Sequence, residues 1–147
     1  MSKTVSFLVF ISMFCAVFCD INDCGSVNGE IVSVTVGGCH PPARCILKRG
    51  TNATIEISFK TKEDIDELKA VVHGIVLNVP LPFAIPNSNA CVDSGIECPM
   101  KSGQTYKYVA SLPVENEYPK VTVDVKWELR SKDDKDVVCA LIPAKVA

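Results

Sequence analysis

The chain has 147 residues, of which 15 are lysine or arginine and 17 are aspartate or glutamate, giving a formal net charge of −2 at pH 7. Because it carries no stripe of basic residues to neutralise phosphates, nucleic acid is not expected as a partner. This length predicts one domain, which can bury about two thirds of the surface of its unfolded chain.

An N-terminal leader comes first in the chain. Lys3 precedes a run of about 14 mostly apolar residues over 5–18, an arrangement typical of a signal peptide. The run is shorter than the ~20 residues that cross a bilayer, so a retained membrane anchor is the less favoured alternative. Residues 1–19 are therefore predicted to be a signal peptide cleaved before Asp20, and residues 20–147 to be a secreted, soluble domain.

Six cysteines remain beyond the leader, and an even number in an exported chain predicts disulfides. They are Cys24, Cys39, Cys45, Cys91, Cys98 and Cys139. Two pairs are close together in the sequence, and both lie between the first and the last cysteine. Six cysteines allow 15 pairings, so this spacing favours nested disulfides without fixing the connectivity.

Alternation of apolar and polar residues predicts that the mature chain is built of β-strands. In chain order, the predicted strands cover residues 31–36, 54–60, 106–112, 121–129 and 137–142. In the first of them, Val32, Val34 and Val36 are expected to share one face. Proline, glycine and asparagine clusters between the runs predict turns, and residues 62–68 could form one helical turn. The sequence therefore predicts an all-β sandwich.

One segment, residues 70–83, is apolar on both faces for most of its length. It is either a central strand that is covered on both sides or a strand that faces an apolar cavity. Pro80, Pro82 and Pro86 limit pairing with a neighbouring strand. Large apolar side chains on such an irregular stretch favour a groove or the mouth of a pocket.

The sequence offers little catalytic chemistry. His40 and His73 are the two histidines, and neither lies in a nucleophile, zinc-protease or phosphate-binding motif. Cys39 and Cys45 flank His40, but no second cluster completes a zinc site, so a disulfide is the better interpretation. We expect no enzyme activity, no catalytic residue, no cofactor and no metal. A dispersed catalytic triad is the alternative.

A glycosylation sequon and a charged turn are expected at the surface. Asn52-Ala53-Thr54 is an N-glycosylation sequon just before a predicted strand, so Asn52 is expected to carry a glycan. Residues 131–136 mix both charge signs between two predicted strands, which is typical of a solvated hairpin tip.

Several motifs along the mature chain carry a resemblance to a known family. They are DCG at 23–25, VVHG at 71–74, VPLPFAIP at 79–86, the Cys91–Cys98 pair followed by Pro99, TYKY at 105–108, LPV at 112–114, EYP at 117–119 and VKWEL at 125–129. Together they resemble the Niemann-Pick type C2-like group of the MD-2-related lipid-recognition (ML) family, in particular its arthropod members. The resemblance covers the whole mature chain in order.

The resemblance implies an immunoglobulin-like β-sandwich of about seven strands in two sheets, with an apolar cavity between them. It implies the disulfides Cys24–Cys139, Cys39–Cys45 and Cys91–Cys98. It also implies a set of ligand-binding residues at the mouth and in the interior: Leu81, Phe83, Val114, Tyr118, Pro119, Val125 and Trp127. Phe83 and Tyr118 are expected to act as movable gates and Val114 as a wall.

The implied function is that of a secreted, monomeric lipid carrier that encloses a sterol, a fatty acid or a semiochemical and transfers it, with transient contact to a membrane or a lipid receptor. A lysosomal destination is the alternative location. A lipid-sensing immune module, an adhesion domain with a packed core and a secreted hydrolase are the alternative functions. Against the adhesion domain, Trp127 lies between Cys98 and Cys139, which is not the immunoglobulin Cys–Trp–Cys spacing.

Overall fold

The computed structural model describes residues 21–39 and 43–147. The predicted signal peptide and His40 lie outside the described residues. Nine strands and no helix occur in the described part of the chain. The strands are β1 (Asn22–Asp23), β2 (Gly29–Val36), β3 (Cys45–Leu47), β4 (Thr51–Thr61), β5 (Leu68–Val76), β6 (Val79–Phe83), β7 (Thr105–Val114), β8 (Thr122–Ser131) and β9 (Asp136–Val146). Among these residues, none forms a helix suited to crossing a membrane.

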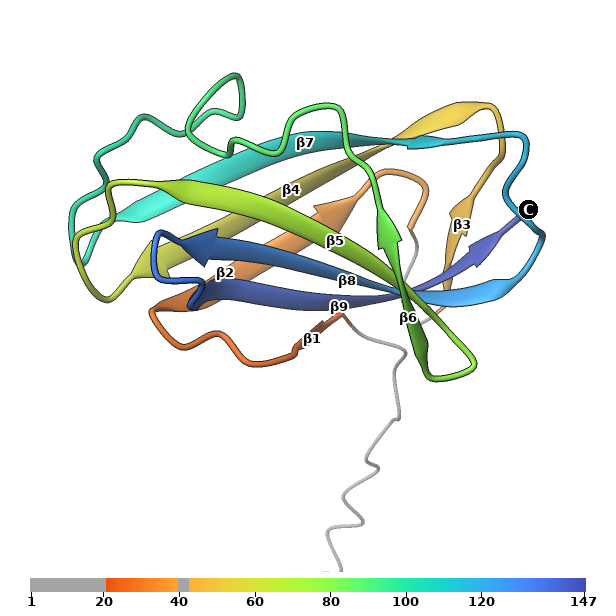
Figure 1. The fold of residues 1–147 in the computed structure, drawn as a ribbon, viewed down its shortest axis with the longest axis horizontal. Coiled ribbons are helices and arrows are strands. Elements are labelled where there is room, and N and C mark those ends of the chain that lie inside the picture. The colour runs from red at the N-terminus through yellow and green to blue at the C-terminus, as the bar shows by residue number, and fades with distance from the viewer. Residues whose placement is uncertain (1–20, 40–42) are drawn as a thin grey trace, which may run out of the picture.

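The strands form two sheets that face each other (Figure 1). The larger sheet has the order β1-β9-β8-β5-β6, with β3 paired in parallel to β9. The smaller sheet has the order β2-β4-β7, and its strands are all antiparallel. The expected immunoglobulin-like sandwich is confirmed, with two short strands, β1 and β3, in addition to the predicted seven.

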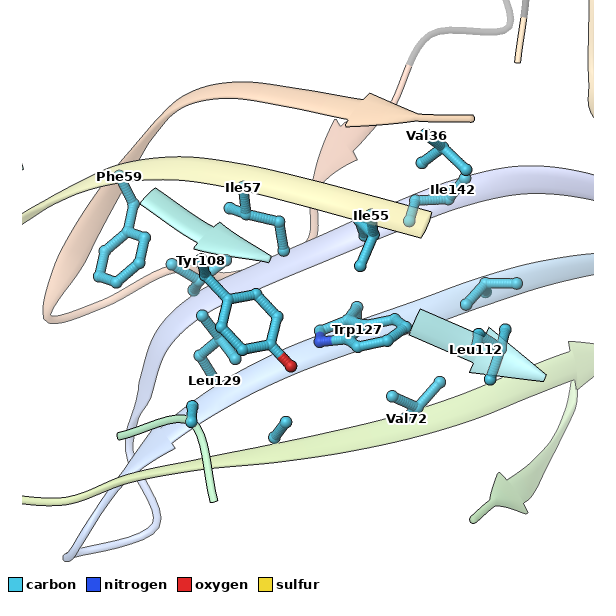
Figure 2. Packing of buried hydrophobic residues seen from close by; sticks show 14 of the residues in the cluster. Val36, Ile55, Ile57, Phe59, Val72, Tyr108, Leu112, Trp127, Leu129 and Ile142 are labelled. Atoms are coloured by element: carbon cyan, nitrogen blue, oxygen red, sulfur yellow. The ribbon is translucent and has the colours of Figure 1, made fainter. Parts of the chain in front are cut away.

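The core consists of the inward-facing residues of both sheets. On β4 the alternating residues Ile55, Ile57 and Phe59 are buried, and on β8 the inward positions include Val125 and Trp127. Figure 2 shows Ile55, Ile57, Phe59 and Trp127 between the two sheets. Alternate residues of a strand point to opposite faces, so the period-two pattern in the sequence correctly identified the buried face of β4, β7 and β8.

The expectation that Val32 shares a face with Val34 and Val36 is wrong. The β2–β4 pairing shifts register between Ile31 and Ser33, so Val32 is an extra residue in a β-bulge. The bulge reverses the alternation, and the side chain of Val32 is 62% exposed.

The apolar segment 70–83 is a hairpin of β5 and β6 rather than one strand. Leu77 and Asn78 at its tip both have positive φ, 50° and 64°, as a two-residue type I′ turn requires. β5 lies between β8 and β6 in the larger sheet, and its residues Ala70 and Val72 are buried in the core. The helical turn considered for residues 62–68 does not form; instead Ile65 makes an isolated bridge to Met100.

Three disulfides join the six cysteines, as the fold prediction required. They connect Cys24 to Cys139, Cys39 to Cys45, and Cys91 to Cys98, which are the pairs that the resemblance implies. The first closes a sequence separation of 115 residues and ties the N-terminal segment to β9. The second joins Cys39, which follows β2, to Cys45, the first residue of β3, so it links the ends of the connection between the two sheets.

The two sheets approach each other closely along the edge where β2 faces β9. A Cβ atom on Gly29 of β2 would overlap the carbonyl oxygen of Val137 in β9, and the N–H groups of Val27 and Asn28 donate to the Asp136 carbonyl oxygen. At the opposite edge, segment 88–94 hydrogen-bonds both to β5 and to β7. It joins the sheets at the end of that edge away from β6.

Candidate functional site

An aromatic pair closes one end of the sandwich. Phe83 is the last residue of β6, and Tyr118 lies in the connection between β7 and β8. Their ring centroids are 5.0 Å apart and the rings meet edge to face at 82°. Such a pair contributes about 0.5–1.5 kcal/mol beyond the burial of its area. We call Phe83 and Tyr118 the gate.

A small apolar cavity of about 10 Å³ lies directly behind the gate. Besides the gate itself, it is lined by Leu47, Leu112, Val114, Val123, Val125 and Val146. These six residues come from four strands of both sheets, β3, β7, β8 and β9, and Phe83 adds β6. The cavity is therefore a gap in the core between the two sheets rather than a surface groove.

A second apolar cavity of about 20 Å³ continues toward the middle of the sandwich. Leu47, Leu112 and Val125 line both cavities. The remaining residues of the deeper one are Val36, Ala53, Thr54, Ile55, Trp127, Ile142 and Ala144. The two cavities share these three residues and together mark one apolar path from the gate to Trp127, and no aspartate, glutamate, lysine, arginine or histidine lines either of them.

Gly74 on β5 makes room for the gate. A Cβ atom built on Gly74 would overlap Cε2 of Phe83 and lie 3.1 Å from Cδ2 of the same ring and 3.2 Å from Cγ2 of Val123. Phe83 therefore packs onto the bare backbone of β5. Any larger residue at this position would displace the ring from its contact with Tyr118.

Arg49 holds the loop that carries Tyr118. Its Nη1 donates to the carbonyl oxygen of Asn116 at 3.2 Å and to that of Tyr118 at 3.5 Å. The N–H of the neighbouring Gly50 donates to the carbonyl oxygen of Val114 at 2.6 Å. The turn between β3 and β4 thus anchors the end of β7 and the first half of the loop that carries Tyr118.

Tyr118 titrates above its usual range. Its partial burial raises the pKa of the phenol, and the carboxylates of Glu115 and Glu117 raise it further. The hydroxyl consequently stays protonated at neutral and acidic pH, so the gate carries no charge.

The structure brings most of the sequence-predicted ligand residues together. Phe83, Val114 and Tyr118 line the cavity behind the gate, Trp127 lines the deeper cavity, and Val125 lines both. Leu81 and Pro119 line neither. Leu81 lies on β6 and is 49% exposed, and Pro119 is exposed next to Tyr118.

Several lining residues were not predicted from the sequence. Leu112 and Val123 occupy apolar positions of strands that the alternation did predict. Their inward orientation was therefore a signal from which their place in the cavity lining could have been predicted. Leu47 lies in the three-residue strand β3, which is too short for an alternation to be recognised. Arg49 gave no signal, because its partners are backbone carbonyls of a loop distant in sequence.

A cluster of charged and histidine side chains lies on β5, β8 and β9, away from this path. Glu128 is 2% exposed and accepts two hydrogen bonds from Arg130, at 3.0 and 3.1 Å. Lys126 and His73 lie 3.8 and 3.9 Å from the same carboxylate. Burial, followed by the nearby carboxylate of Glu128, raises the pKa of Asp136 from 3.8 to about 6. The cluster does not form a metal site, and no group of metal-ligating side chains occurs among the described residues.

Comparison with known proteins agrees with this architecture. The family model described as the ML domain matches residues 19–146. The NPC intracellular cholesterol transporter 2 homolog a of Drosophila melanogaster is 46% identical over 128 residues, which is 86% of each chain. The ecdysteroid-regulated 16 kDa protein of Manduca sexta is 46% identical over 125 residues, 84% of this chain and 86% of that protein.

A solved structure shows the same arrangement of strands. The Niemann-Pick type C2 protein from the Japanese carpenter ant superposes with a TM-score of 0.82 at 28% identity, over 87% of this chain and 99% of the ant chain. The chain is therefore not an enzyme. Its sequence, disulfides and sandwich show that it belongs to the ML family, in the Niemann-Pick type C2-like group.

Proposed function

We propose that this protein is a lipid carrier that encloses a sterol or a fatty acid between its two sheets and delivers it to an acceptor. The observation that carries the proposal is the apolar path from the gate to Trp127, which no aspartate, glutamate, lysine, arginine or histidine lines. The names of relatives from fly to cattle, which describe cholesterol transporters, support a lipid as the ligand.

Loading requires the sheets to separate. The two cavities measure about 10 and 20 Å³, whereas pockets that bury a small molecule measure about 300–1,000 Å³. Burial of a chain of ~16 methylenes yields roughly 13 kcal/mol before losses, and lost ligand freedom removes much of this gain. That surplus is available to open the gate and repack the apolar residues that now fill the path.

The hairpin beside the gate is suited to contact an apolar surface during transfer. Leu77, Val79 and Leu81 are 92%, 55% and 49% exposed, and Leu81 is close in sequence to the gate residue Phe83. We infer that this hairpin meets a membrane or a lipid receptor. Leu77→Asp should slow lipid transfer to vesicles without changing the equilibrium affinity, whereas Val32→Asp, on the other sheet, should change neither.

The site hypothesis is tested by displacement of a fluorescent fatty acid and of a fluorescent sterol. Phe83→Ala should change the affinity or exchange rate of the preferred ligand severalfold, and Val32→Ala, an exposed apolar position on β2, serves as the matched control. The ligand that competes in the wild type identifies the lipid class. If neither probe binds the wild-type protein, the carrier function is wrong. If both bind but Phe83→Ala behaves like the control, the gate assignment is wrong.

We also propose a secreted, monomeric product cleaved before Asp20 and glycosylated at Asn52, whose side chain is exposed at the start of β4. Expression in insect cells followed by N-terminal sequencing tests the cleavage. A shift in electrophoretic mobility after treatment with an N-glycosidase, absent in Asn52→Gln, tests the glycan. Recovery in lysosomes rather than in the medium would favour the lysosomal alternative.

A further inference from the structure

Two buried polar atoms in the centre of the sandwich have no hydrogen-bond partner among the described residues. They are Oη of Tyr108 and Nε1 of Trp127, and both residues are 1% exposed. Buried polar groups in proteins are nearly always paired, because an unpaired one has lost its hydrogen bonds to water without replacement. Two such atoms together in an apolar core therefore call for an explanation.

The two atoms belong to one pair. The ring centroids of Tyr108 and Trp127 are 6.2 Å apart, and Figure 2 shows the phenol oxygen and the indole nitrogen directed toward each other. The nearby indole N–H slightly opposes the effect of burial on the phenol, yet the pKa of Tyr108 still rises to about 12. The phenol is therefore a neutral O–H group at any physiological pH.

The pair stands at the inner end of the apolar path. Along β7, Val114 lines the cavity behind the gate, Leu112 lines both cavities, and Tyr108 lies four residues beyond Leu112 on the buried side of the strand. Along β8, Val125 lines both cavities and Trp127 lines the deeper one. A ligand that enters at the gate and extends past Leu112 therefore arrives at these two polar atoms.

The chemistry of the pair selects a hydrogen-bond acceptor. The indole nitrogen is a donor only, and a phenol donates one hydrogen and also accepts. Since neither atom has a hydrogen-bond partner in the described part of the chain, the indole N–H and the phenol O–H are both available to donate to one acceptor. A carboxylate would bring an uncompensated charge into an apolar interior, which is far more costly than burying a neutral oxygen.

We propose that Tyr108 and Trp127 form a polar subsite at the inner end of the pocket, which binds a hydroxyl or ketone oxygen on the end of the lipid that enters first. This inference rests on the proposed lipid-carrier function. The subsite should favour ligands that carry oxygen at both ends, such as ω-hydroxy fatty acids, over the parent fatty acids, whose tails are entirely apolar.

The test compares a series of ω-hydroxy fatty acids of increasing chain length with the parent fatty acids. An unpaired hydroxyl inside an apolar pocket should weaken binding by about tenfold or more relative to the parent. In the wild type we expect this loss to disappear at one chain length, where the hydroxyl reaches Tyr108. In Tyr108→Phe the loss should return at that length, while the affinity for the parent acid stays within about twofold.

Tyr106→Phe is the matched control, because Tyr106 carries its hydroxyl at the surface, where it accepts from the N–H of Lys101. This variant should keep the wild-type preference. Trp127 is the only tryptophan of the chain, so its fluorescence supplies a second readout that needs no variant. A hydroxyl that bonds within the pair should shift the emission wavelength, and the parent acid of equal length should not.

The outcomes separate the subsite from the carrier function. If the parent acids bind and Tyr108→Phe leaves the ratio of the two affinities unchanged, or if no chain length restores binding of the hydroxy acids, the subsite is refuted and the carrier function stands. If neither series binds the wild-type protein and a fluorescent sterol also fails to bind, the carrier function is refuted as well.

Discussion

The contact between Gly74 and Phe83 gives a sharp prediction for the substitution Gly74→Ala. The new methyl group would overlap Cε2 of Phe83 and stand 3.2 Å from Cγ2 of Val123. Because the backbone of Gly74 does not have the positive φ that penalises other residues, alanine brings no strain of its own. The effect should therefore come mainly from the displaced aromatic ring, because Val123 has to give by only a few tenths of an ångström.

The size of the effect follows from what the ring loses. Overpacking costs about 1–3 kcal/mol, and loss of the edge-to-face contact with Tyr118 costs about 0.5–1.5 kcal/mol. These costs overlap if the ring swings outward, so we expect Gly74→Ala to lower the free energy of unfolding by about 1–2 kcal/mol. The gate should also open more easily, which should raise both the association and dissociation rates of a fluorescent lipid by roughly tenfold.

A double-mutant cycle measures whether Phe83 is the cause. Chemical denaturation and stopped-flow lipid exchange are compared for the wild type, Gly74→Ala, Phe83→Ala and the double variant. In the Phe83→Ala background the alanine at position 74 should cost nothing or add stability, since the space is then vacant. If Gly74→Ala costs the same in both backgrounds, the two residues are not coupled and the account of the gate is refuted.

Three further predictions concern the anchor of the Tyr118 loop, the charged cluster and the disulfides. Arg49→Met should free the Tyr118 loop and raise both lipid exchange rates about fivefold, with a change in affinity of less than about twofold; unchanged rates in stopped flow would contradict the anchoring role. Because the pKa of Asp136 is raised from 3.8 to about 6 in the folded protein, its protonated form stabilises the fold. That contribution should be fully present below about pH 4, and the free energy of unfolding should fall by about 1–2 kcal/mol as the pH rises through 6. Urea denaturation at pH 4 to 7 measures this fall, which Asp136→Asn should abolish. An identical fall in the variant would refute the assignment. Removal of the Cys24–Cys139 disulfide, which closes 115 residues, should destabilise the protein by about 4–5 kcal/mol, against about 2 kcal/mol for the Cys39–Cys45 disulfide; equal losses in melting experiments would contradict the loop-length argument.

The fold class was predictable because most strands bury one face. The alternation in 121–129 requires a strand with one wet and one buried side, and β8 has that form. The bulge at Val32 was not predictable, because the extra residue is defined only by its pairing with β4. The short strands β1 and β3 likewise depend on β9 as a partner rather than on a pattern of their own.

The candidate site was accessible to sequence reasoning in part. Residue spacing indicated only that segment 70–83 was unusually apolar, and the meeting of Phe83 with Tyr118 came from the family resemblance. No local pattern relates Arg49 to the carbonyl oxygens of Asn116 and Tyr118, which are 67 and 69 residues away. Such contacts arise only when the two sheets pack, so a single sequence does not display them.

The close approach of β2 and β9 at Gly29 keeps that edge of the sandwich closed. At Gly29 the backbones almost touch, and the Cys39–Cys45 bond holds the connection between the sheets beyond the other end of β2. Segment 88–94 fastens the far end of the opposite edge to both sheets. The two sheets can therefore separate only at the corner between β6 and the end of β7, where Phe83 and Tyr118 lie. The distance between spin labels placed across that corner should increase when lipid enters, while the distance between labels across the β2–β9 edge should stay the same.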